Sequence, residues 1–242
     1  MASEFAPCSE EQKAAVLERL GVIRQNLADA CKAAGRTTDE VTLMAVTKTV
    51  SPELINLAVD HGVRVLGENR VQEFLSKREE YRPEAEVQFI GHLQTNKVKQ
   101  IIGKVTLIHS VDSLHLAEAI DKAAAQQGII MPVLIEVNIG GEESKSGVSP
   151  AELPQLLENM QKLSAVRADG LMTIPPPMTD ESAQMRTFTE MRSLFEKMQQ
   201  YAPLSVLSMG MSGDYAAAVR CGATLVRIGS GLFGARYYPP AQ

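Results

Sequence analysis

The sequence predicts a single α/β domain that folds as a (β/α)8 TIM barrel with an extra N-terminal helix. Short segments rich in Val, Ile, Leu and Thr alternate with helical patterns through about eight units, which favours a closed barrel over an open sheet. These segments are apolar throughout, as is typical of parallel strands that are buried on both faces. The chain has 242 residues, close to the roughly 250 that are typical of this fold.

The expected elements follow in order along the chain. Apolar residues recur at helical spacing from Ala15 to Ala30, so a helix is expected over about 10–34, and Gly35 is a suitable stop. Strands are expected at residues 41–47, 63–67, 87–92, 106–111, 132–139, 168–174, 204–208 and 224–229. Helical patterns are expected at residues 52–61, 73–81, 113–127, 150–163, 179–201 and 213–221. The barrel thus spans about 41–235, and because no linker divides the chain, we expect one domain over residues 1–242.

Composition and charge exclude several classes of protein. With 24 Lys and Arg residues against 29 Asp and Glu, a net charge of -5 and no Trp, a general electrostatic nucleic-acid binder is not expected. No apolar stretch is long enough for a membrane span, and the polar, acidic N-terminus is unlike a signal peptide. Cys8, Cys31 and Cys221 are too scattered for a disulfide framework or a metal site. We therefore expect a cytoplasmic globular protein that acts on a small molecule.

The first candidate functional residue is Lys48, at the end of the first expected strand. In a parallel barrel, functional groups gather at the C-terminal ends of the strands and in the loops that follow. By the two-residue period of a strand, Lys48 shares a face with Val46. If Val46 points into the barrel, the Lys48 ammonium lies at its mouth, where it is costly unless it is paired, deprotonated or covalently bound. The alternative is that Lys48 extends from the strand end into solvent.

A second unusual charge lies in the last expected strand. Arg227 is surrounded in the sequence by Leu225, Val226 and Ile228, and these apolar neighbours predict that it is buried. A buried guanidinium does not lose its proton, so it needs a hydrogen-bond acceptor. The acceptor is either an interior carboxylate or a bound ligand.

Two glycine-rich loops follow the seventh and eighth strands, at residues 208–214 and 229–234. Glycine lets the backbone approach an anion closely, and N–H groups at the start of a helix can hold that anion. Phosphate sites of TIM barrels frequently form from these two loops. The second loop also spells GxGxxG, but too little chain follows it for a dinucleotide-binding unit.

Other polar residues near strand ends carry weaker signals. His92 ends the third expected strand and His109 lies in the fourth, but their spacing is not that of metal ligands, so no metal site is expected. Asn69 follows the second strand and is suited to cap a helix. The segment at 142–147, after the fifth strand, is by default a solvated loop.

A lysine at the barrel mouth, two phosphate-binding loops and an interior arginine together fit a phosphorylated carbonyl compound that is bound as a Schiff base. Pyridoxal 5′-phosphate is such a compound. It has an aldehyde for Lys48, a phosphate for the loops, and a ring nitrogen that Arg227 can face.

The sequence resembles the pyridoxal phosphate homeostasis protein family, whose fold is similar to the barrel domain of alanine racemase. The resemblance spans nearly the whole chain, in order, and rests on the segments AVTK (45–48), GENRVQE (67–73), IGHLQTNK (90–97), SKSG (144–147), GLMT (170–173), LSMGMS (207–212) and VRIGSGLFGAR (226–236). One departure is Ser230-Gly231, where the family pattern often has Thr-Ala. Serine keeps the hydroxyl group and Gly231 keeps the N–H group, so phosphate binding should be retained.

The resemblance also implies a role for each site residue. Lys48 would carry the cofactor as a Schiff base, and Arg227 would face the pyridine nitrogen. The residues implied to hold the phosphate are Ser212, Gly213, Gly229 and Ser230, and those implied to lie near the ring are Asn69, His92 and Met209. A guanidinium beside the ring nitrogen disfavours its protonation, so the ring becomes a weaker electron sink, as suits a carrier.

The family is regarded as non-catalytic, so the favoured interpretation is a pyridoxal phosphate carrier and regulator without robust turnover. Recipient apoenzymes are conceivable partners, and the resemblance favours a monomer. Tyr237 and Tyr238 lie beyond the last loop, and we expect them to pack in the tail, so no second acid/base faces Lys48. Three alternatives stay open: a racemase or lyase that uses the same cofactor, a cofactor-free Schiff-base aldolase acting on sugar phosphates, and an interaction module.

Overall fold

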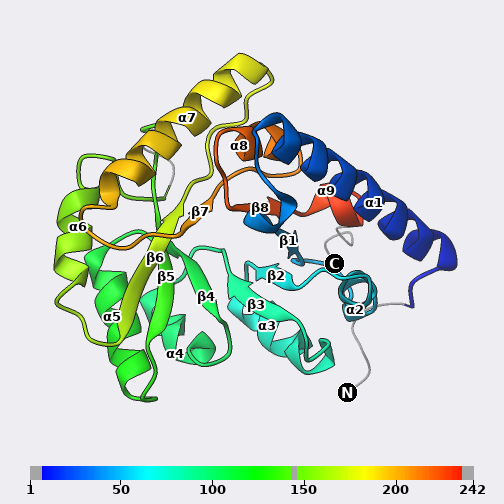
Figure 1. Ribbon diagram of the computed structural model, residues 1–242. Helices are drawn as coiled ribbons and strands as arrows, with labels where there is room; N and C mark the ends of the chain where they lie inside the picture. Colours follow the sequence, from blue (N-terminus) through cyan, green and yellow to red (C-terminus); the bar gives the residue numbers. More distant parts are fainter. Residues whose placement is uncertain (1–6, 143–145, 236–242) are drawn as a thin grey trace.

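The protein is described by a computed structural model that covers residues 7–142 and 146–235 (Figure 1). Ser144 and Lys145 of the SKSG segment lie outside these residues, as do Arg236, Tyr237 and Tyr238. The expectations for these five residues therefore stay predictions.

Eight parallel strands form a closed barrel in sequence order, with β8 paired to β1, so the predicted (β/α)8 fold is confirmed. Their bounds are β1 (Thr42–Val46), β2 (Val65–Glu68), β3 (Glu86–Phe89), β4 (Leu107–Val111), β5 (Met131–Glu136), β6 (Val166–Met172), β7 (Val206–Ser208) and β8 (Leu225–Ile228). Each strand lies inside its predicted segment or extends beyond it by at most two residues. Most strand residues are buried on both faces, which is why the segments lack polar alternation.

Helices surround the barrel on its outside (Figure 1). The α-helices are α1 (Glu10–Ala33), α2 (Pro52–Asp60), α3 (Val71–Lys77), α4 (Val98–Ile101), α5 (Leu114–Ala125), α6 (Leu153–Met160), α7 (Glu181–Met198), α8 (Tyr215–Arg220) and α9 (Ser230–Phe233). Three 3-10 helices are η1 (Thr38–Glu40), η2 (Arg78–Glu80) and η3 (Thr95–Lys97). The sequence did not predict α4 or α9, because four residues are too few to show a helical period.

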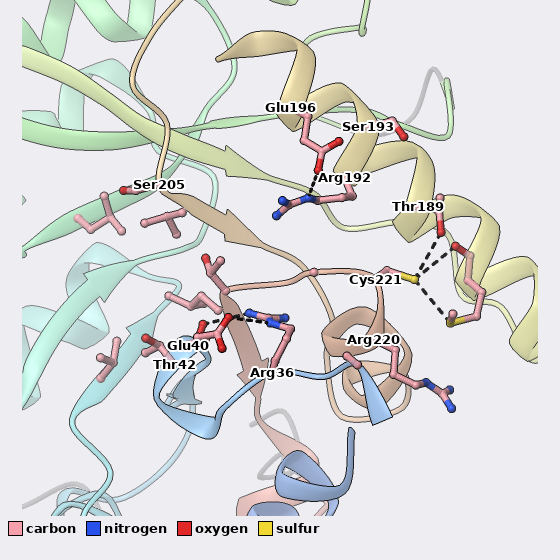
Figure 2. Close-up of a pocket in the computed structure, with 18 of the residues that line it drawn as sticks. Arg36, Glu40, Thr42, Thr189, Arg192, Ser193, Glu196, Ser205, Arg220 and Cys221 are labelled. Atoms are coloured by element: carbon pink, nitrogen blue, oxygen red, sulfur yellow. Dashed lines mark hydrogen bonds and ion pairs between the residues drawn. The ribbon is translucent and has the colours of Figure 1, made fainter. Parts of the chain in front are cut away.

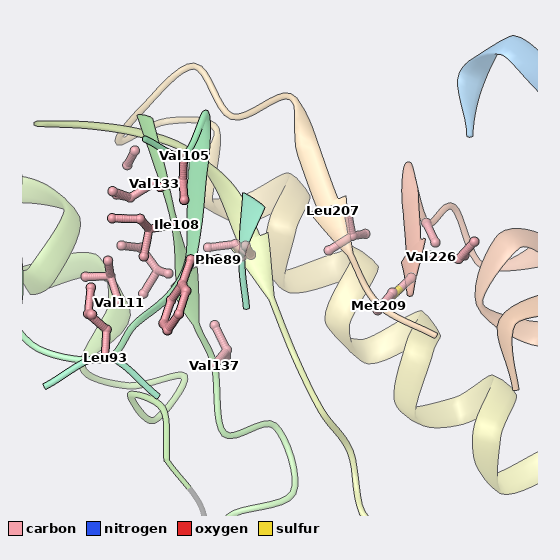
Figure 3. Packing of buried hydrophobic residues seen from close by; sticks show 14 of the residues in the cluster. Phe89, Leu93, Val105, Ile108, Val111, Val133, Val137, Leu207, Met209 and Val226 are labelled. Carbon is pink, nitrogen blue, oxygen red and sulfur yellow. The ribbon is translucent and has the colours of Figure 1, made fainter. Parts of the chain in front are cut away.

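The main hydrophobic core lies between the outer face of the strands and the helices. Figure 3 shows part of it, with Phe89 and Ile108 on one side and Leu207, Met209 and Val226 on another. The barrel interior holds two smaller apolar clusters, which are Met44, Val46, Val65, Ile90 and Leu225, and Leu107, Leu134 and Met172. Val46 belongs to an interior cluster, so its side chain points into the barrel, which was the condition for placing Lys48 at the barrel mouth.

Helix α1 is the predicted extra N-terminal helix, and it packs against α8 and α9 (Figure 1). Its start is fixed by a capping box, in which the Gln12 N–H donates to Ser9 Oγ (3.2 Å) and the Ser9 N–H donates to Gln12 Oε1 (2.8 Å). One face buries Val16, Leu20 and Ile23 against the barrel helices. Because α8 follows the first glycine-rich loop and α9 lies within the second, α1 braces the elements that position those loops.

Within residues 7–142 and 146–235, no helix is both long and apolar enough to cross a membrane.

Candidate functional site

Closure of the barrel brings the first and last strands side by side. Ala45 of β1 is paired with Ile228 of β8, so the segments that follow these strands leave the barrel next to each other. Gly229 packs directly on Val46: a Cβ atom at Gly229 would lie 3.4 Å from Val46 Cβ. The loop after β8 therefore lies beside the residues that lead into Lys48.

Lys48 lies in a tight turn over Thr47–Val50 and not in the strand itself. The strand ends at Val46, and the turn is closed by a hydrogen bond from the Val50 N–H to the Thr47 carbonyl oxygen (3.1 Å). The two-residue period that linked Lys48 to Val46 does not extend into a turn, so the prediction that both share a face loses its basis. The Lys48 side chain is half-buried, so the alternative of full extension into solvent does not hold either.

The residue after Lys48 has an unusual backbone conformation. Thr49 has φ +61°, and it is the one residue other than glycine with positive φ in the described part of the chain. A β-branched residue rarely adopts this left-handed region because its side chain crowds the backbone. The Thr49 N–H donates to Glu73 Oε1 of α3 (2.5 Å), which ties the turn to that helix.

Beneath the turn lies a buried network of charged and hydroxyl side chains. Lys77 Nζ donates to Glu73 Oε1 (2.8 Å) and to the Thr47 carbonyl oxygen (3.0 Å), and it lies 3.4 Å from Glu68 Oε1. Glu68 Oε1 also accepts from Thr47 Oγ1 (2.7 Å) and from the Tyr81 hydroxyl (2.5 Å). Burial, together with the Glu68 charge, raises the pKa of Tyr81, so its hydroxyl stays a donor. These contacts make the floor of the turn rigid.

The two glycine-rich loops meet as predicted. The Gly231 N–H donates to Ser212 Oγ (3.0 Å), which joins the loop after β7 to the first turn of α9. A Cβ atom at Gly231 would lie 3.1 Å from Ser212 Cβ and Oγ, which shows how closely the two loops approach each other. A Cβ atom at Gly213 would meet nothing within 4 Å, which shows open space above that residue. The two loops thus lie side by side at the first turn of α9, and N–H groups at the start of a helix can hold an oxyanion group.

Arg227 lies inside the barrel and is fully buried, with 3% of its surface exposed. Its two terminal nitrogens donate to Ser208 Oγ (2.6 Å) and to the Thr173 carbonyl oxygen (2.8 Å). Both acceptors are neutral, so among the described residues Arg227 is hydrogen-bonded but makes no close ion pair. Burial lowers the pKa of Arg227 to about 10, and the charges of Asp214 and Glu136 act in the opposite direction. The guanidinium therefore stays charged at neutral pH.

Two carboxyl groups near this arginine are also perturbed. Burial raises the pKa of Glu136, at the end of β5, and the charge of Asp112 raises it further. Burial likewise raises the pKa of Asp214, at the start of α8. Both groups lie at the C-terminal side of the barrel, in the region that holds the loops.

Asn69 and His92, both implied to lie near the cofactor ring, line one pocket of about 680 Å³ between α3 and the loop after β3. Asn69 Oδ1 is buried and has no hydrogen-bond partner among the described residues. His92 lies beyond the end of β3, which stops at Phe89; its side chain is 60% exposed, and its Nδ1 is 3.7 Å from Asp112 Oδ2. The structure therefore brings these two residues together at the C-terminal end of the barrel.

Met209 occupies a different environment from the other candidate residues. Its side chain is fully buried in the main core, where it lies near Val226 (Figure 3). The neighbouring Ser208 points the other way, since it contacts Arg227 in the barrel interior. The structure therefore gives no support to a ring contact through the Met209 side chain.

Comparisons with known proteins show the family to which the chain belongs. A model of the family described as "Alanine racemase, N-terminal domain" matches residues 19–237. The pyridoxal phosphate homeostasis protein of Aquifex aeolicus (strain VF5) is 46% identical over 224 residues, which cover 91% of this chain and 98% of that protein. The chain belongs to the pyridoxal phosphate homeostasis protein family. The resemblance found from the sequence motifs is thereby confirmed.

Solved structures of similar proteins share the barrel of this family member. An unknown protein from Bifidobacterium adolescentis has a TM-score of 0.90 at 32% identity, covering 96% of this chain and 100% of that chain. PipY of Synechococcus elongatus PCC7942, solved with PLP bound, has a TM-score of 0.78 at 34% identity, covering 90% of this chain and 100% of that chain.

The buried network of Lys77, Glu73 and Glu68 was not predicted from the sequence of this family member. Glu68 and Glu73 both lie in the GENRVQE segment, which we interpreted as turn chemistry around Asn69. The contacts of Lys77 with Glu68 and with the turn of Lys48 join parts of the chain far apart in sequence. The available signal was the charge of Glu68 directly after three apolar residues of β2, because a buried carboxylate requires partners.

A larger pocket of about 990 Å³ opens at the opposite end of the barrel, around the starts of β1 and β8 (Figure 2). Its charges are paired with each other: Arg36 Nε lies 3.4 Å from Glu40 Oε2, and Arg192 Nε lies 2.7 Å from Glu196 Oε1. Functional groups of parallel barrels gather at the C-terminal ends of the strands, so we place the candidate site of this family member there. No group of His, Cys, Asp and Glu in the described residues could hold a metal ion.

Proposed function

We propose that this chain binds pyridoxal 5′-phosphate through a Schiff base at Lys48 and takes part in pyridoxal phosphate homeostasis without robust catalysis. One observation carries the proposal. The Lys48 turn follows β1, and the loop after β8 lies next to it because β1 and β8 are paired. That loop is in turn hydrogen-bonded to the loop after β7. The relatives support it, because PipY was solved with PLP bound and the Aquifex protein is named for pyridoxal phosphate homeostasis.

The residues present fit each part of this ligand. Bound pyridoxal phosphate supplies an aldehyde, which condenses with a primary amine and releases water. The half-buried Lys48 is the amine at this rim. The two loops are joined by the hydrogen bond from the Gly231 N–H to Ser212 Oγ, so they can act together on a phosphate. We propose that Ser212, Gly213, Gly229 and Ser230 hold it.

The interior arginine suits a carrier better than a catalyst. Arg227 keeps its proton at neutral pH and is fixed by Ser208 and Thr173. A fixed positive charge facing a pyridine nitrogen disfavours protonation of that nitrogen. The ring then withdraws electrons less strongly, which disfavours carbanion chemistry. We further propose that Asn69 and His92 face the ring, that the protein acts in the cytoplasm as a monomer, and that apoenzymes receive the cofactor.

The direct test is the visible absorption spectrum with added pyridoxal phosphate, followed by borohydride reduction and mass analysis of peptides. We expect the wild-type protein to become yellow and the reduced adduct to map to Lys48. Lys48→Ala should lose this absorbance, because the substitution removes the amine that would form the Schiff base. Lys99→Ala, which changes an exposed lysine, is the matched control and should behave as wild type. A wild-type protein that stays colourless and untrapped would refute the proposal.

A second assay separates the carrier from an amino-acid racemase or lyase. The loaded protein is incubated in D₂O with a panel of amino acids, and deuterium at Cα is measured by mass spectrometry. We expect no incorporation above that of free pyridoxal phosphate. Rapid incorporation into any amino acid would leave the site in place but would make the protein an enzyme.

A further inference from the structure

The turn that carries Lys48 holds a backbone conformation that its own sequence does not favour. Thr49 has φ +61° at the third position of the Thr47–Val50 turn, where glycine or asparagine is usual when φ is positive. A threonine keeps this conformation only when its surroundings determine it. The groups that contact the turn therefore decide how Lys48 leaves it.

Glu73 and Lys77 supply this support from α3. Glu73 Oε1 accepts the N–H of Thr49 (2.5 Å), in the middle of the turn. Lys77 Nζ donates to the carbonyl oxygens of Thr47 (3.0 Å) and Val50 (3.4 Å), at its two ends. The two side chains bond to each other (2.8 Å), and 17% of the Glu73 and 2% of the Lys77 side-chain surface is exposed. Charge-assisted hydrogen bonds with this degree of burial are stronger than neutral or exposed ones.

We propose that Glu73 is a positioning residue for Lys48: its carboxylate, backed by Lys77, holds Thr49 in the left-handed conformation and so directs the Lys48 amine toward the cofactor site. The inference rests on the proposed function, since it concerns the reaction of Lys48 with an aldehyde. Glu73 does not touch the phosphate cradle, which is built from the loops after β7 and β8. Its loss should therefore impair covalent capture and spare phosphate recognition.

Two ligands distinguish this role from a merely structural one. Pyridoxal 5′-phosphate can react with Lys48, whereas pyridoxine 5′-phosphate has the same ring and phosphate but an alcohol in place of the aldehyde. If Glu73 only stabilised the fold, its replacement would weaken the binding of both ligands. If Glu73 positions the amine, only the reaction with the aldehyde should suffer.

The experiment compares Glu73→Ala and Glu73→Gln with a control, Glu79→Gln, whose side chain is 83% exposed. Schiff-base formation is followed by rapid-mixing absorbance, pyridoxine 5′-phosphate binding by calorimetry, and folding by circular dichroism. We expect Glu73→Ala to slow covalent binding by about 10-fold or more, with pyridoxine 5′-phosphate affinity unchanged within about 2-fold, because reactions depend steeply on the placement of the attacking group. Glu73→Gln should lie between, since its amide oxygen still accepts the Thr49 N–H but does not neutralise Lys77. The control should match wild type.

A rescue variant completes the test. Glycine adopts positive φ without steric cost, so Thr49→Gly added to Glu73→Ala should recover part of the lost rate. The proposal is overturned by a Glu73→Ala protein that captures the aldehyde at the wild-type rate, by equal losses for both ligands, or by a double variant no faster than Glu73→Ala. If Glu73→Ala does not fold, the same criteria apply to Glu73→Gln with and without Thr49→Gly. A wild-type protein that captures no aldehyde contradicts the proposed function instead.

Discussion

His109 and Arg227 lie in one hydrogen-bonded chain inside the barrel, and the chain determines which of them is charged. Arg227 donates to Ser208 Oγ (2.6 Å), which lies 3.2 Å from His109 Nδ1. Gln88 Oε1, 2.7 Å from His109 Nε2, can only accept, so in the neutral ring Nε2 carries the proton and Nδ1 accepts the Ser208 hydroxyl proton. Burial, and then the Arg227 charge, hold the pKa of His109 well below its usual range. His109 is therefore neutral in the folded protein.

This neutral histidine should make stability depend on pH. Below about pH 6.5 the unfolded chain protonates His109 and the folded protein does not, so the free energy of unfolding falls as the pH is lowered. We expect wild type to lose on the order of 1 kcal/mol from this group between pH 7.5 and 5.5. Urea unfolding of His109→Gln at both pH values should show a flatter dependence than wild type.

The matched control for this prediction is His115→Gln, because His115 is exposed. Its pH dependence should follow that of wild type. Glu136 and Asp214 change the stability in the opposite direction, because their pKa values are raised in the folded protein. Their contribution to the free energy of unfolding falls as the pH rises above about 4. Equal slopes for His109→Gln and wild type would show that His109 is protonated in the folded state.

Single residues differ in how well the sequence predicted them. The burial of Arg227 was predicted from its apolar neighbours in the strand and is confirmed, whereas the cofactor role of Lys48 stays a prediction. The roles of Glu73 and Lys77 were not, since their contacts depend on the path of a turn between strand and helix. A ring contact for Met209 was implied by a motif. In the structure its side chain lies in the main core, because side chains alternate along a strand and the neighbouring Ser208 points into the barrel.

At the scale of elements, α1 acts as a brace for the two glycine-rich loops that we propose as the phosphate cradle. Arg19 Nε donates to the Leu232 carbonyl oxygen of α9 (2.7 Å), and Asn26 Nδ2 donates to the Tyr215 hydroxyl of α8 (3.0 Å). Both contacts are made by side chains of one helix, to the helix that follows the first loop and to the helix that lies within the second. A helix outside the barrel thus helps to fix the geometry of a site at its rim.

Removing one of these contacts should loosen the cradle. We expect Arg19→Gln to release pyridoxal 5′-phosphate about 5-fold faster, because a lost hydrogen bond is worth about 1 kcal/mol. Dissociation is measured by transfer of the bound cofactor to an excess of a trapping amine. Arg24→Gln is the matched control, since Arg24 donates from the same helix to the His61 carbonyl oxygen near α2. Similar release from both variants would show that α1 has no specific effect on the cradle.

The sequence predicted long elements better than short ones. Eight strands and the longer helices were predictable because burial on both faces and a 3.6-residue period leave clear patterns. Helix α9 was interpreted as a loop, since its four residues begin Ser-Gly and are set by packing against α1. Its short helical turn nevertheless presents Ser230 and Gly231 to the cradle.

At the scale of the whole molecule, one core connects nearly all elements. The main cluster of buried side chains extends from Val16 in α1 to Leu232 in α9. The alternation of strands and helices was enough to predict the barrel. It did not show how close the Lys48 turn lies to the loop after β8, because that depends on closure between β1 and β8.

A single core should unfold as one unit. We expect urea unfolding followed by circular dichroism and by tyrosine fluorescence to give coincident transitions, which also tests the prediction of one domain. Leu20→Ala, in the buried face of α1, should lower the free energy of unfolding by about 2–5 kcal/mol. Both transitions should therefore move together to lower urea concentrations. Separate midpoints for the two probes would show that α1 or another part unfolds independently.

The pairing of β1 with β8 has a consequence for the folding of the protein. Lys48 follows the first strand of the barrel, whereas Ser212, Gly229 and Ser230 follow its last two strands. Under the proposed function, the amine and the residues that would hold the phosphate come together only when β8 pairs with β1. A chain in which this pair has not yet formed should therefore not retain pyridoxal phosphate.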